Sequence, residues 1–204
     1  LRAFEFALDK YQAAARRVGG EVPANCADEL CSLVRSMQEA QAARELLSGD
    51  VWLRYNHARF LAEISNAYDQ AEQELQAVLK VLPNCSSAQS NMASVQLDLG
   101  NHRKAEALCR SVLERQPQDV NTRATLANAL VAQQRFAEAI EQYAEVLKSD
   151  PDDPTIHNYL GGALIAMGRS TEALAHLRDA VRLDPDYFEA SYNLGLLLGG
   201  QRQF

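Results

Sequence analysis

Residues 158–185 read NYLGGALIAMGRSTEALAHLRDAVRLDP, and this stretch decides the fold. Apolar residues at helical spacing, a glycine at position 168 and a closing proline at position 185 together predict two helices joined by a short turn. Gly161 and Ala173 lie one on each predicted helix, and antiparallel helices approach closely only where both offer small side chains. The stretch therefore predicts a tightly packed helix hairpin.

The same pattern recurs along most of the chain at intervals of 34 residues, marked by Pro83, Pro117, Pro151 and Pro185. A fixed period of this length indicates stacked supersecondary units, not one globular core. When each proline is position 32 of a unit, the full units cover 52–85, 86–119, 120–153 and 154–187, and a partial unit covers 188–204. Residues 1–51 fall out of this register. They are predicted to be helical over 3–17 and 25–47, as a degenerate repeat or an N-terminal cap.

Small residues recur at two positions of the unit. Position 8 holds Ala93, Ala127, Gly161 and Gly195, and position 20 holds Ala71, Ala105, Ala139 and Ala173. Larger residues at positions 7, 24 and 28 are predicted to fill the space between hairpins, and Gly100 and Gly168 are predicted to form left-handed turns. Asp153 followed by Pro154 predicts a helix N-cap with proline at the first helical position. No segment alternates like a strand, so the fold is predicted to be all-α.

These residues resemble the tetratricopeptide repeat (TPR) family over about residues 52–204. The match is clearest at Tyr159, Leu160, Gly161, Gly168, Ala173, Leu177, Ala180 and Pro185. The resemblance implies a right-handed α-solenoid of stacked antiparallel helix hairpins, whose first helices line a concave groove. The chain departs from the family pattern at Gln96, where a large residue is usual, and at Gln134, which replaces the turn glycine.

In this family the groove is lined by positions 2, 5, 6, 9, 12 and 13 of each first helix. The resemblance implies that the groove of this chain is polar, uncharged and mostly small-chained. Asparagine both donates and accepts hydrogen bonds, so a row of asparagines can hold the backbone of an extended peptide. The alternative is that these residues are ordinary solvated side chains of helix surfaces. The candidate site comprises Asn56, Asn91, Ser94, Asn128, Asn158, Tyr159, Tyr192 and Asn193.

Two other kinds of site are disfavoured. A clamp for acidic C-termini needs cations in the groove, and no lysine or arginine occupies positions 2, 5, 6 or 9 from residue 86 onward. The four histidines (His57, His102, His157 and His176) are scattered among the units, and none pairs with an acid in a nucleophile or metal motif. No glycine-rich phosphate loop follows a strand. The sequence therefore predicts no catalytic site, no metal and no cofactor.

Composition limits the partners and the compartment. The net charge of −7 argues against nucleic acid as the main partner, because such proteins usually carry a basic stripe. No apolar run is long enough to insert in a membrane. Four cysteines (Cys26, Cys31, Cys85 and Cys109) form no metal pattern, so they are predicted to be free thiols in a reducing compartment, which favours a cytoplasmic location.

Both ends of the sequence are interpreted as cuts in a longer natural protein. Leu196, Leu197 and Leu198 would then lie exposed near the end of the array, where apolar surface favours association between copies. The predicted function is a non-catalytic scaffold that binds a peptide or protein segment in the concave groove. Two alternatives stay open. The chain could position substrates within a larger glycosyltransferase- or sulfotransferase-like enzyme, or it could self-assemble into a homo-oligomer through the repeat ends.

Overall fold

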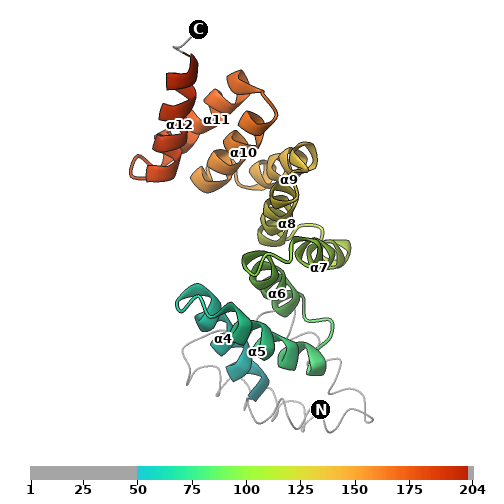
Figure 1. The fold of residues 1–204 in the computed structure, drawn as a ribbon. Helices are drawn as coiled ribbons and strands as arrows, with labels where there is room; N and C mark the ends of the chain where they lie inside the picture. Colours follow the sequence, from blue (N-terminus) through green and yellow to red (C-terminus); the bar gives the residue numbers. More distant parts are fainter. Residues whose placement is uncertain (1–49, 202–204) are drawn as a thin grey trace. The chain divides into compact units, whose positions relative to one another are not determined.

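The computed structural model describes residues 50–201, and within that range the regular elements are all helices (Figure 1). This confirms the prediction of an all-α fold. The predicted helices over 3–17 and 25–47 lie outside the described residues. The described helices are α4 (Asp50–Glu63), α5 (Tyr68–Val81), α6 (Ser86–Asp98), α7 (His102–Arg115), α8 (Val120–Ala132), α9 (Phe136–Ser149), α10 (Pro154–Ala166), α11 (Ser170–Leu183) and α12 (Phe188–Gln201).

The described residues form two compact units, which divide between Asn101 and His102. In the first unit, α5 packs against both α4 and α6. In the second, each of the helices from α7 to α12 packs against the next, and α10 also packs against α12. Consecutive hairpins therefore stack by burying one face of each helix against its neighbours, as a solenoid requires. The boundaries assigned to the 34-residue units stay predictions.

The small residues of the full units are buried as predicted from the sequence, whereas Gly195 of the partial unit is exposed. Ala71, Ala105, Ala139 and Ala173 are fully buried at position 20, as are Ala93 and Ala127 at position 8. At Gly161 an added Cβ would lie 2.8 Å from both Cγ and Cδ2 of Leu177. That spacing is below van der Waals contact, so the hairpin of α10 and α11 closes only because residue 161 has no side chain.

The core positions differ from the prediction by one residue near the end of each second helix. Position 28 was expected to fill the space between hairpins, but its residues are half-buried. The residues at position 27 are buried instead, and they are Val78, Val112, Val146 and Ala180. Position 27 lies three residues after position 24, so the two share one helix face and join the same apolar stripe. The buried face thus follows the helical period.

The turns between the helices of a hairpin share one geometry. Asn66, Gly100, Gln134 and Gly168 have positive φ angles of 51°, 77°, 60° and 74°. After Gly168, the Arg169 N–H donates to the Leu164 carbonyl at 2.9 Å, a hydrogen bond that closes the helix end in the manner of a Schellman motif. The predicted turn glycines are confirmed. Gln134 adopts the same left-handed conformation despite its side chain, so the packing of the hairpin determines the backbone conformation of this turn.

The polar groups at the start of α10 and the buried side chain of Gln96 form hydrogen bonds with nearby residues. Asp153 Oδ1 accepts from the backbone N–H groups of Thr155 and Ile156 at 2.8 and 3.1 Å, and Pro154 occupies the first helical position, as predicted. Gln96 is fully buried, and its Oε1 accepts from Asn101 Nδ2 at 3.0 Å. A polar side chain is tolerated at this core position because a hydrogen bond offsets its loss of water.

Charged side chains join α7 to the turn between α8 and α9. Glu106 accepts from Arg135 at 2.7 Å, from Gln133 at 2.9 Å and from Arg110 at 3.0 Å. Arg135 also donates to Glu138 at 2.6 Å. Partial burial would raise the pKa of Glu106, but the hydrogen bonds from these three donors lower it to about 2. The cluster therefore stabilises the ionised form of Glu106.

The cysteines differ from the prediction. Cys109 is free and buried in α7, as expected, but Cys85 is disulfide-bonded at the start of α6. The prediction of free thiols is therefore wrong for Cys85, while Cys26 and Cys31 lie outside the described residues. Within residues 50–201, no helix has both the length and the apolar character needed to cross a membrane.

Candidate functional site

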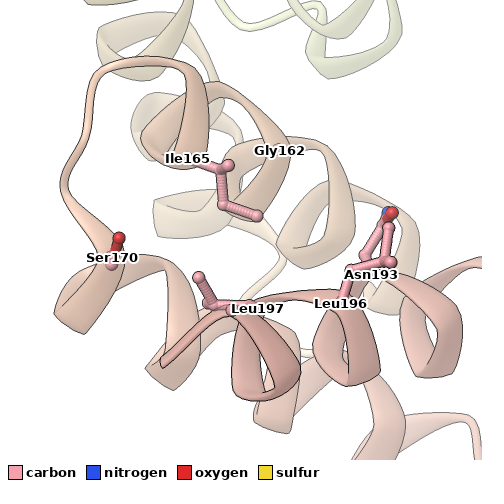
Figure 2. A pocket seen from close by; sticks show the side chains of 7 residues that line it. Gly162, Ile165, Ser170, Asn193, Leu196 and Leu197 are labelled. Atoms are coloured by element: carbon pink, nitrogen blue, oxygen red, sulfur yellow. The ribbon is translucent and has the colours of Figure 1, made fainter. Parts of the chain in front are cut away.

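A pocket of about 610 Å³ opens in the second unit between α10 and α12 (Figure 2). The side chains of Ile165, on α10, and Leu197, on α12, point toward each other across it. Ser170, the first residue of α11, lies at one side. The lining is mostly apolar and carries no charged residue: Gly162, Ile165, Ser170, Asn193, Leu196, Leu197 and Gly200. The volume falls in the range of small-molecule sites.

Two predicted groove residues meet beside this pocket. Asn193 Nδ2, on α12, donates to Asn158 Oδ1, on α10, at 2.9 Å. Asn158 Nδ2 in turn donates to the Tyr187 hydroxyl at 3.3 Å, and the Asn158 side chain is only 3% exposed. Asn158 therefore links α10 to α12 by a hydrogen bond. Asn193 lines the pocket, and within the described residues its Oδ1 accepts no hydrogen bond.

The two predicted tyrosines are more exposed than the asparagines. Tyr159 lies with its ring centroid 6.1 Å from that of the buried Tyr143, and burial raises the pKa of Tyr159. Tyr192 stacks on Phe188 at 6.2 Å, and both rings are exposed. Phe188, Tyr192 and Leu196 are four residues apart along α12, so they form one apolar stripe that leads to the pocket. Aromatic rings with one open face are common at interfaces.

Asn128 has a structural partner. Its Oδ1 accepts from the Tyr143 hydroxyl, which joins α8 to α9 inside one hairpin. Burial raises the pKa of Tyr143, so the phenol stays protonated and able to donate. Asn128 was predicted to contact a ligand, and the hydrogen bond to Tyr143 occupies its carboxamide oxygen.

The remaining predicted residues lie in the first unit. Asn56 Nδ2 donates to the Trp52 carbonyl at 2.9 Å, and Ser94 Oγ donates to the Ser90 carbonyl at 3.4 Å. Asn91 lies beside the Tyr55 hydroxyl, whose pKa is raised by burial. Asn56 and Ser94 therefore each bond the backbone of their own helix. Within the second unit, the structure brings Asn158 and Asn193 together.

Sequence reasoning missed most of the pocket. Ile165 and Leu196 occupy positions 12 and 9 of their units, which belong to the groove set, but the predicted site used only its polar and aromatic members. Leu196 and Leu197 were assigned to an exposed repeat end, and both line the pocket. Reading the apolar residues at positions 9 and 12 in the last units would have indicated an apolar groove wall.

Two histidines that were predicted to be scattered also meet. His157 and His176 belong to one unit, and their Nδ1 atoms lie 3.0 Å apart between α10 and α11. The pKa of His176 is lowered, because the effects of burial and of the neighbouring His157 outweigh those of Asp179 and Glu172. Over residues 50–201, no group of three or more His, Cys, Asp or Glu side chains is placed to hold a metal ion.

The fold is shared with known proteins. The chain resembles "MamA RS-1 ArsTM double mutant", with a TM-score of 0.66 and 18% identity over 74% of this chain and 85% of that one. It also resembles TTC0263, a thermophilic TPR protein of Thermus thermophilus, with a TM-score of 0.66 and 22% identity over 74% of this chain and 82% of that one. A crystal structure of MamA gives a TM-score of 0.64 and 16% identity, covering 76% and 84%. These identities establish a common fold alone.

The sequence itself matches a family. No curated protein matches it. The tetratricopeptide repeat model matches residues 55–120, 125–187 and 163–201, which together cover well over half of the chain. The matched ranges contain the buried small residues and left-handed turns described above. The chain therefore belongs to the tetratricopeptide repeat family.

Proposed function

We propose that this protein is a non-catalytic scaffold that binds an extended peptide or protein segment along α10 and α12. Repeats of this family generally mediate protein–protein interactions. The observation that carries the finer proposal is the hydrogen bond between Asn193 and Asn158 at the edge of an apolar pocket. An amide beside an apolar cavity supports the proposal, because peptide recognition combines hydrogen bonds to the backbone with pockets for side chains.

The chemistry of the bound segment follows from the lining. A backbone N–H of the peptide would donate to Asn193 Oδ1. An aliphatic or aromatic side chain of the peptide would enter between Ile165 and Leu197, where it loses contact with water. The pocket has no charged lining residue, so a charged side chain would be buried there without a partner. We therefore expect the bound segments to share an apolar anchor.

The test uses random peptides displayed on phage, selected against the purified chain and then measured singly by fluorescence polarisation. Leu196→Asp should weaken the selected peptides by about tenfold or more, because it puts an unpaired charge at the pocket. Asn193→Ala should weaken them by roughly two- to tenfold, since one hydrogen bond contributes about 0.5–1.5 kcal/mol.

The matched control is Ile64→Asp, which makes the same kind of change at an exposed aliphatic residue of the first unit. Ile64 is 69% exposed and Leu196 is 58% exposed. If both variants weaken the peptides equally, or if the selected peptides have no apolar residue in common, the proposed site is wrong.

A second candidate function is self-association, which the exposed stripe of Phe188, Tyr192 and Leu196 favours. A second copy would then cover the same apolar surface. Light scattering over a concentration series separates the two candidates. A monomer at every concentration removes self-association and leaves peptide binding intact. A dimer that Leu196→Asp dissociates would support it.

A cytoplasmic location stays a prediction, and the disulfide at Cys85 weighs against it because reducing compartments keep thiols reduced. Thiol labelling of protein taken directly from its host cell under denaturing conditions distinguishes a reducing from an oxidising compartment. Labelling of all four cysteines would favour a reducing compartment. Failure of Cys85 to label before reduction would favour an oxidising one.

A further inference from the structure

One face of α12 carries a carboxylate, an amide and an apolar side chain in order. Glu189, Asn193 and Leu196 follow one another at helical spacing, so they share one face of the helix. Asn193 and Leu196 line the pocket. Glu189 lies in the first turn of α12, about 10 Å from Leu196 along the axis of a helix that rises 1.5 Å per residue. This face therefore leads from the pocket to a negative charge.

That charge stands alone on the two helices that border the pocket. Apart from one histidine, α10 contains no ionisable acid or base, and Glu189 is the one charged residue of α12. The Glu189 side chain is exposed. Among the described residues, Glu189 is hydrogen-bonded to Tyr187 and to no lysine or arginine. A cation that approached this end of the pocket would therefore meet an unneutralised carboxylate.

A chain of hydrogen bonds positions this carboxylate relative to the pocket. Asn193 donates to Asn158, and Asn158 donates to the Tyr187 hydroxyl. The Tyr187 hydroxyl in turn donates to Glu189 Oε2 at 3.4 Å. Burial raises the pKa of Tyr187, so the hydroxyl keeps the proton that it donates. A carboxylate accepts several hydrogen bonds, so this contact leaves Glu189 able to accept from a ligand.

Exposed aromatic rings lie beside the carboxylate. Tyr192 follows Glu189 by three residues on the surface of α12, and Tyr192 is 56% exposed. Burial raises the pKa of Tyr159, on α10, and the charges of Glu189 and Asp153 add to this rise, so both carboxylates lie near the phenol. A lysine or arginine lays its apolar stem and its charge against rings of this kind. The surroundings of Glu189 therefore suit a basic side chain.

We propose that Glu189 binds a lysine or arginine of the segment whose apolar anchor fills the pocket. This inference rests on the proposed function and adds a charge requirement to it. Asn193 lies between the two contacts, where it would bond the peptide backbone. An extended chain advances about 3.3 Å per residue, so the separation corresponds to about two to four residues once the reach of a basic side chain is included. The bound segment thus carries a basic residue at that distance from its apolar anchor.

The first test compares the peptides that three forms of the full chain select from one random phage library. The wild type should enrich lysine or arginine at about two to four positions from the apolar anchor. Glu189→Lys reverses the charge of the surface, so it should keep the apolar anchor and lose the basic residue. Glu141→Lys is the matched control, because it makes the same change at an exposed residue of α9, and it should select the wild-type pattern.

The second test is a double-mutant cycle measured by fluorescence polarisation. The probes are the selected peptides and their twins with glutamine in place of the basic residue. On the wild type the twin should bind about two- to fivefold more weakly, which is the range of an exposed ion pair, and high salt should reduce the difference. On Glu189→Gln the peptide and its twin should bind equally, because the coupling between the two charges is lost.

The outcomes separate this inference from the function on which it rests. Peptides that share an apolar anchor but no basic residue would overturn the role of Glu189 and leave the proposed function standing. An equal loss on replacing the basic residue, on the wild type and on Glu189→Gln, would do the same. If no peptide is selected, or if the selected peptides lack the apolar anchor, the proposed function is wrong and the role of Glu189 is wrong with it.

Discussion

The hairpin of α8 and α9 and the hairpin of α10 and α11 have the same helix–turn–helix backbone but differ in the side chains at equivalent positions. In the first, Asn128 accepts a hydrogen bond from Tyr143. The equivalent residues of the second are Gly162 and Leu177, which have no polar group to pair. Gly162 lines the pocket, and nothing lies within 4 Å of the place where its Cβ would be. The pocket therefore lies where α10 has a glycine at the position of the hydrogen-bonded asparagine of α8.

The hairpin turns differ in the same way. Arg135 and Arg169 occupy the same position of their units, and each bonds a glutamate three residues later. Of the two, Arg135 also bonds Glu106 on α7, the second helix of the preceding hairpin. The residue equivalent to Glu106 in the next unit is Ile140. Backbone geometry is thus constant between the hairpins, while the contacts that set stability and binding vary.

The largest expected effect is at Leu177, which fills the gap left by Gly161. Leu177→Ala should lower the free energy of unfolding by about 2–5 kcal/mol, because it opens a cavity in a fully buried place. Tyr143→Phe, at the equivalent position of the other hairpin, should lower it by only about 0.5–1.5 kcal/mol. Urea unfolding followed by circular dichroism measures both. Equal losses would remove the distinction between the two hairpins.

Overpacking the shared slot should affect both hairpins alike. Ala139→Leu and Ala173→Leu each add a large side chain where the present one is fully buried, and each should cost about 1–3 kcal/mol of stability. The same unfolding measurement applies. If both substitutions are neutral, the register that places these alanines in one slot is wrong.

The ionic cluster should make the α8–α9 turn sensitive to acid. Glu106→Gln should cost about 1–2 kcal/mol at neutral pH, because Glu106 is only 14% exposed and accepts from three donors. The pKa of Glu106 is lowered to about 2 in the folded chain. Its contribution is therefore complete above the unfolded value near 4.5 and is lost as the pH falls toward 2.

Unfolding curves at several pH values check this prediction. Between pH 4.5 and 2, the wild type should lose more stability than Glu106→Gln. Glu172→Gln is the control, since α9 has Ile140 at the position where α7 has Glu106, and so its partner Arg169 has no acid at that position. Parallel pH curves for the wild type and Glu106→Gln would contradict the role given to Glu106.

The smallest effect separates two adjacent glycines. Gly162→Ala should stabilise the chain by about 0.5–1 kcal/mol, because the added methyl group meets nothing and glycine disfavours a helix interior. Gly161→Ala should not stabilise it, since its methyl group would collide with Leu177. Thermal unfolding compares them directly. A gain from both substitutions would show that Leu177 moves aside at little cost.

The sequence predicts what depends on the repeat alone. The buried alanines and the left-handed turns at Gly100 and Gly168 follow from local spacing, so the order of residues is enough to predict them. The pocket could not be predicted in this way, because it depends on a side chain that Gly162 lacks and on the gap between α10 and α12. The pairing of His157 with His176 joins positions 4 and 23 of one unit, which form no linear motif. Disulfide pairing at Cys85 likewise cannot be read from cysteine spacing.

Cys109 is a built-in probe of local opening in the second unit. Its thiol is fully buried in α7, and burial raises its pKa to about 12, so it is neither accessible nor ionised in the closed state. An alkylating reagent can react with it only during moments when α7 detaches. The rate of labelling at Cys109 therefore measures how often α7 detaches from its neighbours. Cysteines introduced at the equivalent positions 143 and 177 would report the same opening for α9 and α11.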